Sequence, residues 1–341
     1  MNQKNLNTFY PFVSVCTPTF NRRPFIPYMI KCFEHQTYPK ERIEWIIIDD
    51  GSDPIGDLLT HIPQVKYFYY DTKMLLGKKR NEMHKKSKGD ILVYMDDDDY
   101  YPPQRIAHAV ETLQSNPSFL LAGSSEMHIY FDKYDKVFQC GPYKANHATA
   151  ATFAFKRELL KDTRYDEENA LAEETKFTKN YTIPLIQLDT LKSILVFSHR
   201  HNSLNKEKLL ETPQQCKITD SPYKVDDFIQ DAELRQFYTH NMNHLLEAYE
   251  PGRPENKPIL MAQIKSMEEK RESIINGLRE KQKYLELQKM YNAKQTNATT
   301  NSEKLLEEKN ILISELLKKV KQLTNELAEL KGGAATSLSR G

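Results

Sequence analysis

The stretch GDILVYMDDDDYYPPQRI, residues 89–106, decides how the rest of this 341-residue sequence is interpreted. Its apolar run, Ile91 to Met95, has the length of a buried β-strand, and four consecutive aspartates, Asp96 to Asp99, follow directly. Adjacent carboxylates repel one another at neutral pH, so the cluster costs stability unless positive charge compensates it. The aspartates therefore form either a solvated acidic turn or a site for a divalent cation, which a phosphorylated ligand could share.

The composition narrows the classes of function. The 48 basic and 47 acidic side chains give a formal net charge of +1, so nothing in the overall charge indicates nucleic acid or an anionic membrane as a partner. The longest apolar runs are strand-sized, and we expect no transmembrane segment and no secretory signal. The four cysteines include no CxxC pair, which fits reduced thiols and predicts a cytoplasmic protein.

Further strands and helices are predicted around this stretch. Apolar runs of strand type cover residues 12–20, 43–48 and 65–70, and helical patterns cover residues 24–36 and 78–86. Strands that alternate with helices predict an α/β fold with a mostly parallel sheet covered on both faces. Ligands of such sheets bind beyond the carboxyl ends of the strands, and three of these strands end in the polar motifs TPTFN, DDGSD and DDDD.

The composition changes after this region. We expect a globular domain over residues 1–220, a connecting segment over 221–257, a coiled-coil region over 258–331 with a break near 292–302, and a disordered tail over 332–341. The last part of the coiled-coil region has a 3-4 spacing of apolar residues, which are Leu306, Ile313, Leu316, Val320, Leu323, Leu327 and Leu330. Such a heptad favours a parallel two-stranded coiled coil and hence a homo-oligomer; the alternative is one amphipathic helix folded onto the globular domain.

Four motifs in order resemble those of the family 2 glycosyltransferases, which have the GT-A (Rossmann-like) fold. They are VSVCTPTFNR (13–22), EWIIIDDGSD (44–53), KKRNEM (78–83) and GDILVYMDDDDYYPPQRI (89–106). The resemblance is close over residues 11–106 and looser to about residue 205. It implies a mostly parallel sheet flanked by helices and a nucleotide-sugar site at one edge of that sheet.

The resemblance also implies which residues bind the nucleotide sugar. They are Pro18, Thr19, Phe20 and Asn21 in the first loop, Asp49 and Asp50 in the second, Arg80 and Asn81 on the basic helix, and Asp96 and Asp97 in the aspartate cluster. In the family the first loop holds the base and ribose, and the acidic residue of the second loop points at the uracil ring. Lys78 and Lys79 depart from the family pattern, in which small residues precede the Arg-Asn pair.

The same resemblance implies a metal, Mn²⁺ or Mg²⁺. Aligning the sequence on Pro103 places Asp96 and Asp98 on the two carboxylates of the DxD motif, and Asp98 is the first candidate for the metal ligand. The segment FSHRHNS (197–203) resembles the late H-x-x-N segment of part of the family. His199 fits its spacing best as a further ligand, and His201 is second.

A catalytic base is implied by LAEETKFTKN (171–180), which resembles the E-D motif of these enzymes. An inverting displacement at the anomeric carbon needs a carboxylate that takes the proton of the acceptor hydroxyl. Glu174 stands where aspartate is more common, and Glu173 is the alternative. An acidic first turn of a helix is the structural explanation for the same pair.

Together these features predict a metal-dependent inverting glycosyltransferase that moves a sugar from a nucleotide sugar, in particular a UDP-sugar, to an acceptor hydroxyl. A nucleotidyltransferase of similar fold is one alternative, although TPTFNRRP lacks the glycine-rich loop of that class. A non-catalytic coiled-coil scaffold with a relic globular domain is the other. A dinucleotide-binding oxidoreductase is excluded because no G-x-G-x-x-G follows the first strand.

Overall fold

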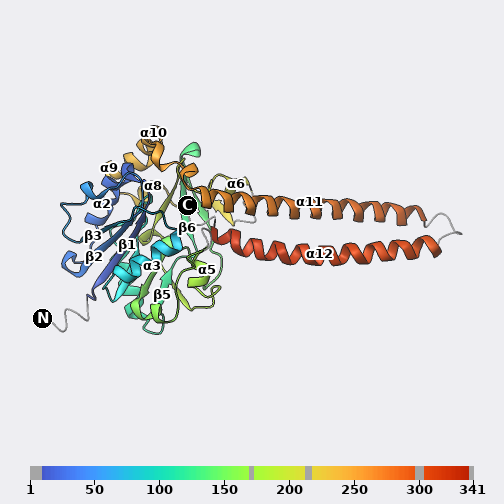
Figure 1. Cartoon of the computed structure of the whole chain (residues 1–341), viewed down its shortest axis with the longest axis horizontal. Coiled ribbons are helices and arrows are strands. Elements are labelled where there is room, and N and C mark those ends of the chain that lie inside the picture. The colour runs from blue at the N-terminus through green and yellow to red at the C-terminus, as the bar shows by residue number, and fades with distance from the viewer. Residues whose placement is uncertain (1–9, 169–172, 212–216, 296–302, 338–341) are drawn as a thin grey trace. The chain divides into compact units, whose positions relative to one another are not determined.

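The computed structural model describes residues 10–168, 173–211, 217–295 and 303–337. The chain divides into two compact units (Figure 1), one of residues 1–261 with 336–341 and one of residues 262–335. The first unit holds both sheets and the second consists of two long helices. The two units are described separately below.

The first unit is built on a seven-stranded, mostly parallel sheet. Its strands, in spatial order, are β3 (Val65–Tyr69), β2 (Ile43–Asp49), β1 (Val13–Thr19), β4 (Ile91–Tyr94), β8 (Ala154–Lys156), β5 (Leu121–Gly123) and β9 (Leu185–Gln187). Only β8 runs antiparallel to its two neighbours. The register pairs Thr19 with Asp49 and Cys16 with Tyr94, so β1, β2 and β4 end at the same edge. The predicted strands and fold class are confirmed.

Both faces of this sheet are covered, because successive side chains of a strand point to opposite faces. On β2, Trp45 and Ile47 belong to one apolar cluster and Ile46 and Ile48 to another. The first cluster packs against α2 (Ile26–Glu34) and α4 (Arg105–Ser115), and the second contains Met83 of α3 (Leu76–Lys86). Burial on both faces explains the continuous apolar runs in the sequence.

A smaller four-stranded sheet and several short helices complete the unit. The sheet has the order β10 (Leu195–Ser198), β6 (Met127–Phe131), β7 (Lys136–Cys140) and β11 (Ile218–Asp220). The short helices are α5 (Glu173–Phe177), α6 (Lys208–Glu211), α8 (Val225–Phe228), α9 (Ala232–Gln236) and α10 (Met242–Glu247). Cys16, Cys32 and Cys140 are buried free thiols. Cys216 lies outside the described residues.

Residues 221–257, expected as a connecting segment, form part of the first unit, which extends to Met261. Their buried side chains include Phe228, Ile229, Leu234, Phe237, Tyr238, Met242 and Leu246. The ring of Tyr238 stacks on Phe197 with 4.5 Å between centroids, and its hydroxyl donates to the carbonyl of Asp99 at 2.9 Å. These apolar residues are spread over short helical turns, so no long periodic pattern marks them as core.

The second unit is a helical hairpin made of α11 (Pro258–Gln295), which begins in the first unit, and α12 (Glu303–Ser337). The two helices run side by side in opposite directions (Figure 1), and a Cβ added at Gly277 would lie 3.0 Å from Cδ1 of Leu323. The predicted break falls largely on residues 296–302, outside the described residues. The helix α12 continues to Ser337, past the expected start of the tail at residue 332.

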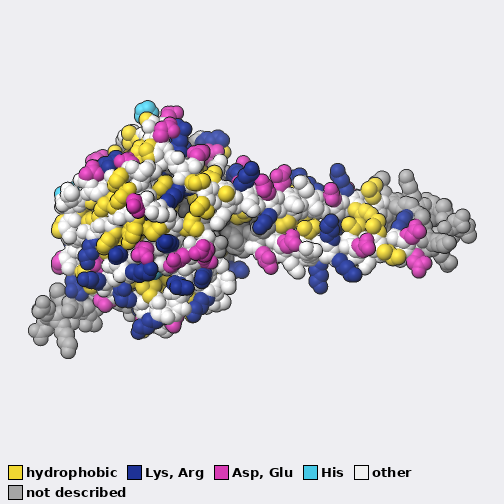
Figure 2. Space-filling model, viewed as in Figure 1, with side chains coloured by type: hydrophobic (Ala, Val, Ile, Leu, Met, Phe, Trp, Pro, Cys, Tyr) yellow, Lys and Arg dark blue, Asp and Glu magenta, His cyan; other side chains and the backbone are white. Residues whose placement is uncertain are grey.

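Charge is distributed evenly over this hairpin. Figure 2 shows basic and acidic side chains interspersed along it, with hydrophobic side chains between them. The heptad side chains Ile313, Leu316, Val320, Leu323 and Leu327 are half-buried, and the side chain of Leu330 lies outside the described residues. Across the described ranges, no helix combines the length and apolar character that crossing a membrane requires.

Candidate active site

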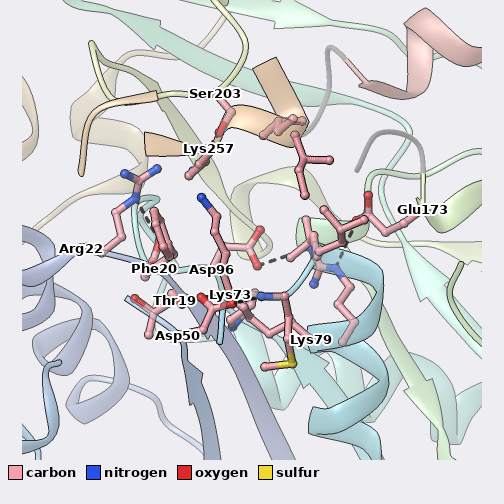
Figure 3. Close-up of a pocket in the computed structure, with 18 of the residues that line it drawn as sticks. Thr19, Phe20, Arg22, Asp50, Lys73, Lys79, Asp96, Glu173, Ser203 and Lys257 are labelled. Atoms are coloured by element: carbon pink, nitrogen blue, oxygen red, sulfur yellow. Dashed lines mark hydrogen bonds and ion pairs between the residues drawn. The ribbon is translucent and has the colours of Figure 1, made fainter. Parts of the chain in front are cut away.

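A cavity of about 250 Å³ lies beyond the carboxyl ends of β1, β2 and β4 (Figure 3). Its lining comes from several separate parts of the first unit. They are Pro18, Thr19, Phe20 and Arg22; Asp50; residues 73–76, Lys79 and Arg80; Asp96, Asp97 and Asp98; Glu173; and Ser203, Leu204 and residues 257–260. Nine of the residues predicted from the sequence therefore line one cavity.

The predicted Asn21 and Asp49 shape the loops around this cavity and do not line it. Asn21 has a left-handed backbone with φ 52°, which asparagine tolerates well. Its Oδ1 accepts from the Asp53 N–H at 3.0 Å, and a Cβ at Gly51 would lie 2.5 Å from that oxygen. The carboxylate of Asp49 accepts from the N–H of Gly51 and from the hydroxyl of Tyr67. Both side chains hold the turns that follow β1 and β2.

Asp50 lines the cavity with its carboxylate engaged on both oxygens. Oδ1 lies 2.5 Å from Nζ of Lys79, and Oδ2 accepts from the Met74 N–H at 2.6 Å. The same Nζ donates to the carbonyl of Thr19 at 2.6 Å. Lys79 thus ties the loop after β1 to the loop after β2. Lys78 and Lys79 stand where the family pattern has small residues. Lys79 forms a buried ion pair, whereas Lys78 is exposed.

The predicted pair Arg80 and Asn81 has two separate roles. Nη2 of Arg80 lies 3.7 Å from Asp96 and its Nε lies 3.4 Å from Oε1 of Glu173. Its guanidinium also lies 4.5 Å from the ring centroid of Tyr94. Asn81 lies outside the cavity lining and bonds to the backbone of Tyr165 through both ends of its amide. Arg80 therefore links the aspartate cluster to the helix α5, while Asn81 holds Tyr165 in the segment that precedes α5.

The aspartate cluster is held by the residues that follow it. The hydroxyl of Tyr101 accepts from the Asp96 N–H at 2.8 Å, and Nη2 of Arg105 donates to the carbonyl of Tyr94 at 3.2 Å. Asp99 does not line the cavity, and its Oδ1 accepts from the Phe197 N–H at 3.0 Å. The sequence DDDDYYPPQRI thus contains both the acidic side chains and the groups that fix their backbone.

Arg22 and His199 set the electrostatics of Asp97 and Asp98. Nε of Arg22 lies 3.6 Å from Asp97, and its Nη2 lies 3.4 Å from Oδ2 of Asp98. Burial, with the adjacent charge of Asp98, raises the pKa of Asp97 to about 7. Burial would also raise the pKa of Asp98, but the hydrogen bond from His199 and the charge of Arg22 outweigh it and hold that pKa well below its usual range.

His199 lies beside Asp98, and His201 does not. Nε2 of His199 lies 3.2 Å from Oδ2 of Asp98, and burial lowers the pKa of this ring to about 3, so it is neutral. The backbone N–H of His199 is held by Oδ1 of Asn202 at 2.8 Å. His201 is buried beside Tyr249, with 6.2 Å between the ring centroids, and does not line the cavity.

The side chains near Asp98 suit a divalent cation that takes its remaining ligands from the phosphates of a bound substrate. Within the ranges that the structure describes, no group of three or more His, Cys, Asp and Glu side chains is arranged for a metal ion. Of the three predicted ligands, Asp98 and His199 bring an oxygen and a neutral ring nitrogen together, while the third, Asp96, lies against Arg80. Two protein ligands completed by phosphate oxygens are a common arrangement for Mg²⁺, and imidazole is also a good ligand for transition metals.

The two candidate bases occupy different environments at the start of α5. Glu173 lines the cavity and pairs with Arg80. Glu174 is fully buried, accepts from the hydroxyl of Tyr181 at 3.3 Å, and does not line the cavity. Residues 171–172, which open the motif in the sequence, lie outside the described residues.

Several lining residues were not predicted from the sequence. Arg22 follows the first motif directly, so its position in TPTFNRR was a usable signal. Ser203 ends the quoted segment FSHRHNS but received no role, and Lys73 and Lys257 lie outside every motif. Lys73 lies over the ring of Phe20, with its Nζ 3.8 Å from the centroid, and Lys257 donates to Oγ of Ser203 at 2.8 Å.

Comparison with known proteins gives a family and several relatives. Residues 14–164 match the sequence model of glycosyl transferase family 2. An uncharacterized glycosyltransferase of Rickettsia bellii is 29% identical over 133 residues, which cover 37% of this chain and 19% of the relative. The chain spans between a fifth and two fifths of the length of the first curated relatives it matches.

Two solved structures show a distant likeness. The TarS fragment 1–349 of S. aureus, in complex with UDP-GlcNAc, is 19% identical, with a TM-score of 0.42 over 54% of this chain and 58% of that one. The mannosyltransferase PcManGT of Pyrobaculum calidifontis, in complex with GDP-Man and Mn²⁺, is 14% identical, with a TM-score of 0.46 over 96% of this chain and 87% of that one.

Proposed function

We propose that the cavity binds a nucleotide sugar and transfers its sugar, with inversion, to an acceptor hydroxyl, because residues 14–164 match the sequence model of glycosyl transferase family 2. The observation that carries the proposal is the convergence of Phe20, Asp50 and the aspartates 96–98 on one cavity at the ends of β1, β2 and β4. A UDP-sugar is the donor we favour, on the sequence resemblance. The acceptor is a molecule with a free hydroxyl.

The chain's own residues support binding and orientation of such a donor. The ring of Phe20 is half-buried and faces the cavity, so it offers an apolar surface to a base or ribose. Arg22, Lys79 and Arg80 surround the cavity and are anchored by carboxylates. Preorganised cations of this kind stabilise negative charge that grows on a leaving diphosphate.

Glu173 is the base that the geometry favours. It lines the cavity, whereas Glu174 is enclosed behind it. A carboxylate within reach of the acceptor can take its proton as the hydroxyl attacks the anomeric carbon. The ion pair with Arg80 fixes the direction of the Glu173 carboxylate, so the pair would position the base before the acceptor arrives.

Asp98 and His199 are the residues that would hold Mn²⁺ or Mg²⁺. When bound there, the cation would bring positive charge to the diphosphate. Arg22 bonds both Asp97 and Asp98 and therefore keeps this pair of carboxylates in place. The cytoplasmic location expected from the reduced cysteines remains a prediction, as does assembly into a homo-oligomer.

Calorimetric titration of UDP tests this proposal directly. We expect wild-type protein to bind UDP more tightly with Mn²⁺ than without it, and Asp98→Ala to lose that difference. A matched control is Asp90→Ala, which removes an exposed aspartate outside the cavity lining. Hydrolysis of a panel of UDP-sugars would then identify the donor.

The outcomes separate the alternatives. If UDP does not bind but GDP or another nucleotide does, the donor carries a different nucleobase and the proposed class of reaction stands. Failure of every nucleotide and nucleotide sugar would refute the enzyme and leave the scaffold hypothesis.

A further inference from the structure

The segment of residues 251–260 lies along the cavity and closes one side of it. Nδ2 of Asn21 donates to the carbonyl of Pro251 at 2.8 Å, and Nη1 of Arg22 donates to that of Gly252 at 3.3 Å. Nζ of Lys73 donates to the carbonyl of Asn256. These contacts join parts of the chain that are about 180 or more residues apart, and every donor comes from the loops around the cavity.

The fit of this segment is close. A Cβ added at Gly252 would lie 2.6 Å from Nδ1 of His201 and 2.8 Å from the carbonyl oxygen of Asn21. Only glycine allows the segment to approach the loop after β1 this closely. Downstream of Gly252, the segment delivers Lys257 to the cavity lining, where Figure 3 shows it with Ser203, Lys73 and Asp96.

The cations that line the cavity fall into two groups. Arg22, Lys79 and Arg80 each have a carboxylate within 4.0 Å. In the described part of the chain, Lys73 and Lys257 have no such ion pair. Lys73 is exposed at the rim, whereas Lys257 is half-buried. A charged group held out of water without a counter-ion costs free energy, so Lys257 gains most if an anion enters the cavity.

We propose that Lys257 is a binding residue for the diphosphate of the donor, brought to the cavity by the segment 251–260. The inference rests on the proposed function, because it names the phosphate group of that same site. The ammonium has three N–H donors, and Ser203 takes one of them, so two remain for phosphate oxygens. Arg22, Lys79 and Arg80 already have carboxylate partners, whereas Lys257 would form its ion pair when the diphosphate binds.

The electrostatic setting agrees with this role. Burial, with the charge of Arg22 nearby, lowers the pKa of Lys257 to about 7, which is what a cation without its anion shows. Asp98 and Asp97 act on Lys257 from the aspartate cluster and raise its pKa, and Lys79 lowers it. A bound diphosphate would add two negative groups to this balance and favour the charged lysine.

Titration calorimetry with inorganic pyrophosphate, UDP and uridine tests the inference on the full chain. For Lys257→Gln we expect about 10- to 100-fold weaker binding of pyrophosphate and of UDP, with uridine unchanged. The control is Lys85→Gln, which removes an exposed lysine whose ion pair is with Glu82 of the same helix and which does not line the cavity. Binding of both phosphates by Lys257→Gln within twofold of wild type would overturn the inference, as would a wild type that binds no pyrophosphate.

A thermal unfolding scan separates binding from folding. Lys257 has no ion pair in the described chain, so Lys257→Gln should unfold at the wild-type temperature or above it. Wild type that binds pyrophosphate but no nucleotide would refute the proposed function and leave the Lys257 test intact. Wild type that binds UDP while Lys257→Gln binds it equally well would refute only the role of Lys257.

Discussion

The Nζ of Lys79 lies 2.5 Å from Oδ1 of Asp50, and both side chains are almost completely buried at the edge of the cavity. The carboxylate that the resemblance assigns to a nucleobase is thus bound by a lysine of its own chain. The same lysine reaches the carbonyl of Thr19, so one ammonium joins the loops after β1 and β2. The pair is therefore part of the framework of the site.

Breaking this pair is predicted to destabilise the first unit. Lys79→Met leaves Asp50 buried with the Met74 N–H as its hydrogen-bond donor among the described residues, and the loss of one member of a buried pair costs about 3–5 kcal/mol in free energy of unfolding. Urea denaturation would measure it. The double variant Asp50→Asn with Lys79→Met should recover most of the loss, because asparagine keeps the acceptor for Met74.

The neighbouring lysine provides the control for that experiment. Lys78 is exposed on the same helix, so Lys78→Met should change the free energy of unfolding by less than about 0.5 kcal/mol. A loss below about 1 kcal/mol for Lys79→Met would show that the pair contributes little and that the loops are held by other contacts.

The two glutamates of α5 are predicted to differ in their kinetics. Glu173→Gln should lower kcat by about 10²- to 10⁴-fold, because a general base is lost while the shape of the side chain is kept. Glu174→Gln should affect stability more than kcat, because Glu174 is buried beside Tyr181 and away from the cavity. Steady-state rates with the identified UDP-sugar, together with thermal unfolding of both variants, would check this. The reverse ranking of kcat would assign the base to Glu174.

Binding of UDP is predicted to take up protons near neutral pH. Lys257 has a pKa of about 7 in the free protein, so about half of it is neutral at that pH. A diphosphate favours the charged form and raises this pKa, so the complex binds more protons than the free protein. Affinity should therefore fall as pH rises from 7 toward 9.

Calorimetry in buffers of different ionisation enthalpy measures this proton uptake. It should reach up to about half a proton at pH 7 from Lys257, and Lys257→Gln should lose that part. Lys73, at the rim, is the other lining lysine whose pKa burial lowers, so Lys73→Gln is the matched comparison. Equal uptake in wild type and Lys257→Gln would place the titrating group elsewhere.

The parts of the site that follow strands could be predicted, because a buried strand and the motif after it are adjacent in sequence. Ile46 and Ile48 mark β2, and Asp50 follows within two residues. Lys257 could not be found this way, since it reaches the cavity through contacts across more than 50 residues, such as that with Ser203. The roles of Asn81 and Asp49 depend on burial and partner geometry, which a motif does not encode.

The arrangement of the two long helices can be tested with cysteines. In the hairpin, residue 277 of α11 packs against residue 323 of α12 of the same chain. In the parallel coiled coil expected from the heptad, two copies of residue 323 would face each other across the seam. Both variants should be made with Cys216→Ser, because Cys216 lies outside the described residues while the described cysteines are buried.

Gly277→Cys with Leu323→Cys is expected to form a disulfide within one chain, because the side chain of residue 323 lies against residue 277 in the hairpin. On a non-reducing gel the product should migrate as a monomer, at a yield that does not depend on protein concentration. Leu323→Cys alone is the control and should remain a monomer. A cross-linked dimer from Leu323→Cys alone would show that α12 pairs between chains, as the heptad predicted.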